Sequence, residues 1–457
     1  MKLGNIEVKE SKTKKKKKIK ISAQKIFNLV SFTFILACCI FYGGRFITLY
    51  LENHKTEDSK TLTDIIIENN SDNGNFKNIN GDYYFEGKEQ NNYIRYSNLN
   101  WRIIRVNNNN TITAVLDNSI TALAVGSETN FKDSYFNLWL NNNDKEYTGI
   151  LENNLNNSSE YLTYTYTCND KINDTKTISC KDTVKDYFIT IPSLNDYVNT
   201  GSSNSFMNNE ENYYLINSNI ENKLWYVDSE GKVNTSDGND ILGVKPVITF
   251  KNNISLIEGN GTKETPYIIE ETNGLFGSYV KLGEDIWRIY DIDGDNIKLS
   301  LETYAEINDS DIKYKYSNTG YYHNDTKDGS LAYYLKNTYL PSLSYSDLIN
   351  EVKYSNGLYS NTTNYDYREV LKTEIDTKVA TLSIGNIFLN PTNTNYYTST
   401  GISKDDNLMY IMKNDFKLYT EVATTNLRVI PVISIDKNRL TNGDGTKNNP
   451  LEVNNEE

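Results

Sequence analysis

Three sequence landmarks occur twice in the same order, and this duplication constrains the fold more than any other feature of the chain. They are a Trp-Arg-Ile triplet, a Pro-Val-Ile run and a Gly-x-Gly-Thr-Lys turn, and they contain Trp101 and Trp287, Pro246 and Pro431, and Gly259 and Gly443. The second copies follow the first by 186, 185 and 184 residues. A fixed order with a nearly fixed offset is typical of tandem repeats, so we expect two similar domains.

An apolar segment precedes the repeats. Residues 26–44 contain no Asp, Glu, Lys or Arg. As a helix they would span about 28 Å, close to the ~30 Å hydrocarbon core of a bilayer. We therefore predict a transmembrane signal anchor over residues 26–51. Two alternatives stay open: a cleaved signal peptide, which would need a small-residue cleavage site, and lipidation at Cys38, because the residues around it resemble a lipoprotein cleavage box.

Charge is distributed unevenly along the chain. Residues 1–25 have ten Lys and two Glu, a net charge of +8, while the whole chain carries −13, so the rest carries −21. Basic residues flanking a membrane span favour the cytoplasmic side, which places the later residues outside the cell. The Lys14–Lys18 run could instead bind nucleic acid, but its position favours a topology signal. The acidic remainder argues against nucleic acid as a partner, because phosphate contacts need dense Lys and Arg.

The pattern of apolar residues divides the chain into five parts. We predict a cytoplasmic tail, the signal anchor, a polar stalk and two repeat domains, with bounds 1–25, 26–51, 52–80, 81–271 and 275–457. The junction Glu270–Gly274 is short, so the two domains should touch or hold a limited set of orientations.

Each repeat should open with a β-hairpin that contains its Trp-Arg-Ile triplet. A helix follows, over Tyr135–Leu140 in the first repeat, and the Pro-Val-Ile strand comes near the end. Strands at both ends with helices between them predict an α+β fold with long loops. Because proline cannot donate a ladder hydrogen bond, the strands of Pro246 and Pro431 should lie at a sheet edge or carry a bulge.

Two of the four cysteines are candidates for a structural site. Cys168 and Cys180 lie twelve residues apart in the first repeat. Outside the cell we expect them to form a disulfide, which would stabilise this short loop by about 3 kcal/mol at most. A metal site would need more soft ligands, and that repeat has no His, so we predict no metal or cofactor.

Catalytic motifs are scarce. The only histidines are His54, in the predicted stalk, and His323, in a polar loop, and neither has a recognisable nucleophile context. We therefore predict that the protein is not an enzyme.

Two further candidate sites have a simpler structural interpretation. Asp291, Asp293, Asp295 and Glu302 match part of an EF-hand, but Asn296 replaces the required glycine and no helices flank the run, which favours a hairpin turn. The tryptophans alternate with polar residues and should pack in the core. Trp225-Tyr226 is the best aromatic candidate for a ligand surface, although packing is favoured there too.

The landmarks of the first repeat also resemble a known family. Tyr83–Gly87, Trp101–Ile104, the Cys168 and Cys180 pair, Gly243–Ile248 and Gly259–Thr262 are similar to the Trp-Arg-Ile domains of uncharacterised, membrane-anchored surface proteins of low-GC Gram-positive bacteria. The resemblance covers nearly all of residues 80–270 and is weaker over 275–453. It implies two tandem domains similar in layout to C-type-lectin-like and formylglycine-generating-enzyme-like folds, in which the first and last strands pair. The family has no established activity.

These observations together predict a non-catalytic, single-pass cell-surface protein that binds an extracellular glycan or protein through two tandem domains. The alternatives are a structural spacer of a surface layer and a wall-modifying enzyme. Binding predicts an aromatic and polar hollow shared by both repeats, whereas a spacer predicts loops that differ between them.

Overall fold

The computed structural model describes residues 60–126, 128–175, 179–271, 274–308, 310–318, 326–359, 366–386, 395–403, 407–413 and 418–454. The predicted cytoplasmic tail and the signal anchor over 26–51 lie outside these residues. In the described part of the chain, no helix combines the length and apolar character that crossing a bilayer requires. Lys60–Glu457 form one compact unit.

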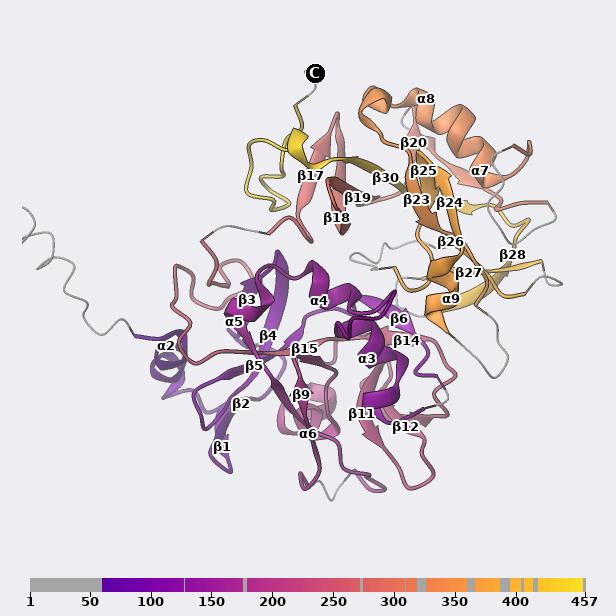
Figure 1. Ribbon diagram of the computed structural model, residues 1–457. Coiled ribbons are helices and arrows are strands. Elements are labelled where there is room, and N and C mark those ends of the chain that lie inside the picture. The colour runs from indigo at the N-terminus through magenta and orange to yellow at the C-terminus, as the bar shows by residue number, and fades with distance from the viewer. Residues whose placement is uncertain are drawn as a thin grey trace, which may run out of the picture. The chain divides into compact units, whose positions relative to one another are not determined.

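Two sheets build the first repeat (Figure 1). The larger has nine strands and contains the Trp-Arg-Ile hairpin; its strands are β1 (Phe76–Ile79), β2 (Asp82–Phe85), β3 (Tyr93–Tyr96), β4 (Leu99–Val106), β5 (Ile112–Leu116), β7 (Leu162–Thr163), β10 (Ile189–Thr190), β15 (Val247–Phe250) and β16 (Tyr267–Ile268). The smaller has the order β13 (Val233–Ser236), β12 (Leu224–Val227), β11 (Tyr213–Ser218), β14 (Leu242–Val244) and β6 (Thr121–Leu123). A separate ribbon pairs β8 (Thr165–Cys168) with β9 (Thr183–Tyr187).

The second repeat has the same two-sheet plan. One sheet has the order β17 (Tyr279–Leu282), β18 (Asp285–Asp293), β19 (Asn296–Leu301), β30 (Pro431–Asp436) and β25 (Val379–Thr381). The other has the order β22 (Lys313–Tyr314), β29 (Leu427–Arg428), β26 (Tyr396–Gly401), β27 (Leu408–Met412) and β28 (Leu418–Val422). Two small ribbons join β20 (Glu306–Ile307) to β21 (Ser310–Asp311) and β23 (Val352–Ser355) to β24 (Glu374–Thr377).

The two repeats share irregularities as well as strand order. The pairing of β4 with β5 shifts between Ile103 and Arg105, and that of β18 with β19 shifts between Ile289 and Asp291. A β-bulge re-aims side chains by inserting one residue. In both repeats the bulge lies three residues after the tryptophan of the triplet, and the strand order matches. The duplication seen in the sequence is therefore also present in the fold.

Short helices connect the strands. They are α3 (Tyr135–Leu140), α4 (Ile150–Asn154), α5 (Ser158–Tyr161) and α6 (Leu194–Asn199) in the first repeat, and α7 (Leu331–Tyr334), α8 (Leu340–Ser342) and α9 (Tyr367–Lys372) in the second. The helix predicted over Tyr135–Leu140 is therefore confirmed, and the fold is mixed, rich in β-sheet with few helices.

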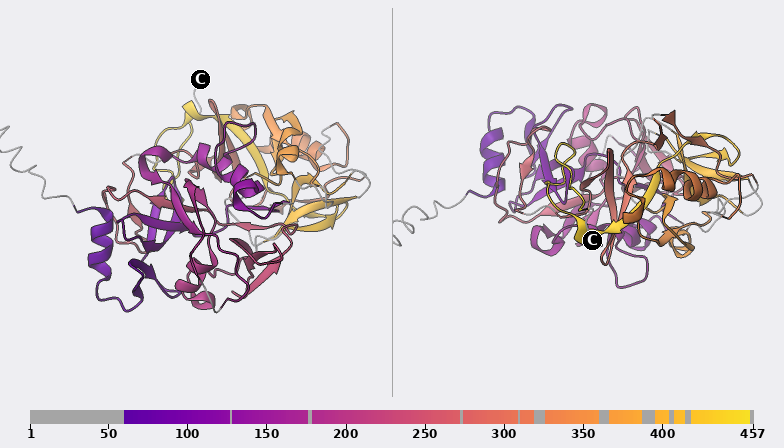
Figure 2. Two further views of the ribbon diagram at one scale, coloured as in Figure 1. Left: turned by 60° about the horizontal axis from the view of Figure 1, so that its bottom comes forward. Right: turned by 90° about the horizontal axis from the view of Figure 1, so that it is seen from above.

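The stalk predicted over residues 52–80 is wrong from Lys60 onward. Helix α2 (Leu62–Asn70) begins at a capping box between Thr61 and Asp64 and buries Leu62 and Ile66 completely in the core. Views from two further directions show this indigo helix beside the strands of the first repeat (Figure 2). An apolar face, even in a polar segment, is stabilised by packing on a sheet.

The interpretation of the prolines was also wrong. Pro246 directly precedes β15, which lies between β5 and β10 inside the sheet, and Pro431 is the first residue of β30, between β19 and β25. A proline at the start of a strand removes no hydrogen bond that the ladder needs.

The repeats contact each other within the compact unit. Trp139 is fully buried, and its Nε1 donates to the carbonyl of Gly385 at 2.7 Å. The Ala124 N–H donates to the hydroxyl of Tyr359, also buried, at 3.3 Å. The predicted contact between the two domains is thus confirmed.

Candidate functional site

A polar cavity of about 570 Å³ lies in the first repeat. Its volume falls in the range of small-molecule sites. Its walls come from the start of the repeat, the end of β5, the loop before β11 and the Gly-x-Gly turn; they comprise Lys88–Asn91, Tyr93, Arg102, Asp117, Asn118, Phe206, Asn208–Glu210 and Thr262–Glu264. We call this the Arg102 pocket.

The arginine of the Trp-Arg-Ile triplet forms the floor of the pocket. Alternation along β4 places Trp101 in the core and Arg102 on the opposite face. The Arg102 guanidinium carbon lies 4.0 Å from the ring centroid of Tyr93 and 4.7 Å from that of Phe206. Its Nε donates to Asn92 Oδ1 at 2.6 Å, and its Nη1 donates to the Tyr93 hydroxyl at 2.9 Å.

Two remaining contacts of Arg102 are long. Nη1 lies 3.5 Å from Asp117 Oδ1, and Nη2 lies 3.5 Å from the carbonyl oxygen of Gln90. Both distances exceed the usual range of N–H···O bonds. Burial lowers the pKa of Arg102, with Asp117 opposing that effect, and it raises the pKa of Tyr93.

A buried ion pair supports the pocket wall from behind. The amine of Lys245 is 3.8 Å from Glu211 Oε2, and both side chains are almost completely buried. Lys245 Nζ donates to Asn209 Oδ1 at 3.0 Å, and Asn209 Nδ2 donates to the Asp117 carbonyl at 2.7 Å. Burial lowers the pKa of Lys245 and raises that of Glu211. These contacts fix the loop before β11 against the end of β5.

The Gly-x-Gly-Thr-Lys turn brings a lysine to the rim. The backbone N–H of Tyr93 donates to the Gly261 carbonyl at 2.8 Å. Gly261 has φ +82°, and a Cβ there would lie 2.7 Å from the Asn91 oxygen, so a larger residue does not fit. The turn is thereby held against the start of β3, which places Lys263 at the pocket.

The second repeat contains an equivalent arginine, tyrosine, carboxylate and lysine, but their ion pairing differs. Arg288 faces Tyr279 across β17 and β18, as Arg102 faces Tyr93. Glu302 follows β19 as Asp117 follows β5. Here, however, Lys447 Nζ lies 2.8 Å from Glu302 Oε1. Within the described residues Lys263, the counterpart of Lys447, has no ion-pair partner. The first repeat's lysine therefore remains available to a ligand.

The predicted cysteine pair lies elsewhere. Cys168 and Cys180 form a disulfide with their Cα atoms 5.2 Å apart, and it ties the end of β8 to the segment before β9. Asn195 Nδ2, from α6, donates to the Cys168 sulfur at 3.5 Å. Neither cysteine lines the Arg102 pocket.

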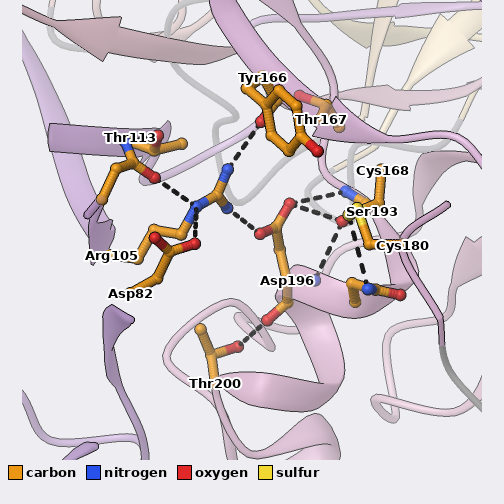
Figure 3. Close-up of polar contacts among 12 residues, drawn as sticks. Asp82, Arg105, Thr113, Tyr166, Thr167, Cys168, Cys180, Ser193, Asp196 and Thr200 are labelled. Carbon is orange, nitrogen blue, oxygen red and sulfur yellow. Dashed lines mark hydrogen bonds and ion pairs between the residues drawn. A yellow bond between two sulfur atoms is a disulfide. The ribbon is translucent and has the colours of Figure 1, made fainter. Parts of the chain in front are cut away.

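A second buried charge cluster adjoins the disulfide (Figure 3). Arg105, almost fully buried on β4, forms an ion pair with Asp196 of α6. Its Nη2 also donates to the Tyr166 carbonyl at 2.7 Å. Asp196 Oδ2 accepts from the Ser193 hydroxyl at 2.7 Å, completing the capping box of α6. The two charged groups of this cluster, Arg105 and Asp196, are bonded to each other and to other groups inside the protein, which indicates a structural role.

The partial EF-hand is a hairpin tip. Asp293 pairs with Asn296 across a two-residue turn in which Gly294 has φ +61°, as such hairpins require. Asp291 lies 3.1 Å from Lys298 Nζ, and Asp295 lies 3.2 Å from Lys437 Nζ. Over the described ranges, no group of three or more His, Cys, Asp or Glu side chains could hold a metal ion.

The remaining candidates do not form a site. Trp101, Trp139 and Trp287 are completely buried, which confirms their predicted place in the core. Trp225 is half-buried, and its Nε1 donates to the Ile172 carbonyl at 2.8 Å. His54 and His323 lie outside the described residues.

Sequence reasoning missed the pocket, although both landmarks that form it were visible. The arginine and the lysine recur in both copies of their motifs, and they were interpreted only as markers of architecture. Comparisons of the chain with protein-family models, with curated proteins and with solved structures find no match.

Proposed function

We propose that this protein is a non-catalytic binding protein, anchored by its N-terminal apolar span and displayed outside the cell, and that the Arg102 pocket is its binding site. The observation that carries the proposal is the duplicated Arg-Tyr-acid-Lys set. In the first repeat this set surrounds an open cavity, and its lysine has no ion-pair partner among the described residues.

The lectin-like layout is part of the same proposal. The pairing of β16 with β3, near the last and first strands of the first repeat, supports it. The parallel bridge between Val280 and Leu451 repeats that pairing in the second copy. In such a layout the loops between the paired termini carry the binding surface, and the loop before β11 is one of them.

A steric variant tests the site. Asn118 is exposed at the pocket, so Asn118→Trp fills the cavity without disturbing the core. Thr303 is exposed at the corresponding position after β19, which makes Thr303→Trp the matched control. The full chain is tested against glycans, cell-wall fragments and surface-protein extracts. We expect binding that Asn118→Trp abolishes and Thr303→Trp retains.

Other results would favour the alternatives. Binding that survives Asn118→Trp would place the site elsewhere, and no binding to any fraction would favour a spacer. Mass spectrometry of the ligand after prolonged incubation would detect a cleaved or transferred product, and a product would replace the binding proposal with an enzymatic one.

A further inference from the structure

The chemistry of the Arg102 pocket narrows the class of ligand. Sugar sites often offer the face of an aromatic ring, because an apolar sugar face packs on it. Here Tyr93 and Phe206 are the aromatic residues of the wall, and they are only 8% and 4% exposed. Both rings pack on the guanidinium of Arg102 instead. A ligand in this pocket therefore has little aromatic surface to stack on.

The charges of the wall do not favour an ion of either sign. Three cationic side chains line the pocket together with four carboxylates, and they are Lys88, Arg102, Lys263, Glu89, Asp117, Glu210 and Glu264. Lys88 is followed by Glu89 and Lys263 by Glu264 in the chain, and the seven groups sum to a net charge of −1, so the opposite charges largely offset each other. A polyanion or a polycation would be attracted by some of these groups and repelled by the others.

The uncharged polar groups fit hydroxyls. Asn91 and Asn118 are exposed at the pocket. Asn118 Oδ1 accepts from Asn209 Nδ2 at 3.0 Å, whereas no described residue accepts from Asn118 Nδ2 or bonds to the Asn91 side chain. Amides and carboxylates together supply donors and acceptors, and a hydroxyl group can serve as both.

From these observations we infer that the ligand of the Arg102 pocket is a neutral, hydroxyl-rich sugar chain, recognised through hydrogen bonds rather than by ring stacking or ion pairing. This inference rests on the proposed function, because it assigns a ligand class to the same pocket. The closed Lys447–Glu302 pair in the second repeat further implies that the first repeat is the one that binds, in place of the binding through both domains that the sequence predicts.

The test is an array that presents neutral oligosaccharides, phosphate- or carboxylate-bearing wall polymers and peptides to the full chain. The expected result is binding to neutral oligosaccharides, with a Kd that changes less than about twofold between 50 and 500 mM salt, since screening acts on charges. The double variant Asn91→Ala/Asn118→Ala should weaken this binding at least tenfold, from two lost hydrogen bonds of about 1 kcal/mol each. Thr303→Ala, at the position equivalent to Asn118, should leave it unchanged.

The outcomes separate the ligand class from the function. Binding to charged polymers or peptides that the double variant removes would overturn the sugar inference and leave the pocket as the binding site. Sugar binding of unchanged affinity in the double variant would overturn the assignment to this pocket. No binding in any part of the array would overturn both proposals.

Discussion

The buried pair of Arg105 and Asp196 offers a sharp test of the packing scheme. Their side chains are 4% and 3% exposed. Asp196→Asn keeps the shape of the side chain and one oxygen for the Ser193 cap, but it removes the buried counter-charge of the guanidinium and leaves the more distant Asp82, whose Oδ2 lies 3.9 Å from Arg105 Nε and whose side chain is 30% exposed. Removing one partner of a buried pair costs about 3–5 kcal/mol.

The second repeat has neither the arginine nor the aspartate of this pair at the equivalent positions. Ser383 caps its turn on Asn386 Oδ1, at 2.9 Å from the backbone nitrogen and 2.7 Å from the hydroxyl, as Ser193 does on Asp196. At the position of Arg105, directly after the bulge, that repeat has Asp291, which pairs with Lys298. An asparagine cap is therefore compatible with the fold when the arginine is absent.

A double-mutant cycle measures the coupling. We expect Asp196→Asn to lower the free energy of unfolding by about 3 kcal/mol, at the lower end of that range because the cap and the ion pair with Asp82 remain. Arg105→Met/Asp196→Asn should recover most of the loss, because the charge that remains, Asp82, is 30% exposed and can be hydrated. Urea unfolding followed by circular dichroism gives the energies. A single-variant loss below about 1 kcal/mol, or a double variant no more stable than Asp196→Asn, would refute this account.

Three further outcomes are expected. Trp139→Phe should destabilise the chain by about 1–3 kcal/mol in urea unfolding, because the Gly385 carbonyl loses a buried donor; an unchanged midpoint would contradict the contact. Burial raises the pKa of Glu211, so the native state binds more protons than the unfolded state above pH 4.5, and stability should fall as pH rises through that window. Glu211→Gln should flatten this slope in urea titrations between pH 4.5 and 7.5, and an unaltered slope would assign it to other groups. Reducing the Cys168–Cys180 disulfide should cost about 2–3 kcal/mol in thermal or urea unfolding and leave ligand binding at the Arg102 pocket intact.

Much of the framework could be predicted from the sequence because it depends on periodicity. Alternating residues around Trp101 and Trp287 define strands with one buried face, and both side chains are completely buried. The duplicated order of the landmarks predicts a duplicated strand order, and both repeats have it. These features can be predicted because the alternation of apolar residues and the order of the repeated motifs are visible in a single sequence.

The first folded segment was missed for a different reason. The turn of the hairpin formed by β1 and β2 is Asn80-Gly81, both with positive φ, a strong local hairpin signal. Its strands are only four residues long, and the residues of each strand do not alternate between apolar and polar, so the pattern that identifies the later strands is weak there. The Thr61 to Asp64 capping box was an equally available signal for α2.

The pocket could not be predicted because it joins four distant segments. Which side chains surround Arg102 depends on the close approach of the turn at Gly261 to β3 and on the buried Lys245 behind Asn209. Neither contact leaves a pattern along the chain. In sequence, Lys245 even stands where the second repeat has Ile430, and it therefore looks like an exposed residue of an edge strand.

The comparison of the two repeats separates framework from specificity. Strand order, the bulge after each triplet and the turn hydrogen bonds to Tyr93 and Tyr279 are common to both copies. The differences concern charge: Lys245 replaces an isoleucine, and Asp117 stands where the second repeat has Glu302. The longer glutamate reaches Lys447, whereas the shorter aspartate lies beside Arg102. Glutamate is longer than aspartate by one methylene group, and this difference accompanies the internal ion pair of the second repeat and its absence among the described residues of the first. Both repeats have the same scaffold, but the binding site is assigned to the first repeat because its lysine is not used in an internal ion pair there.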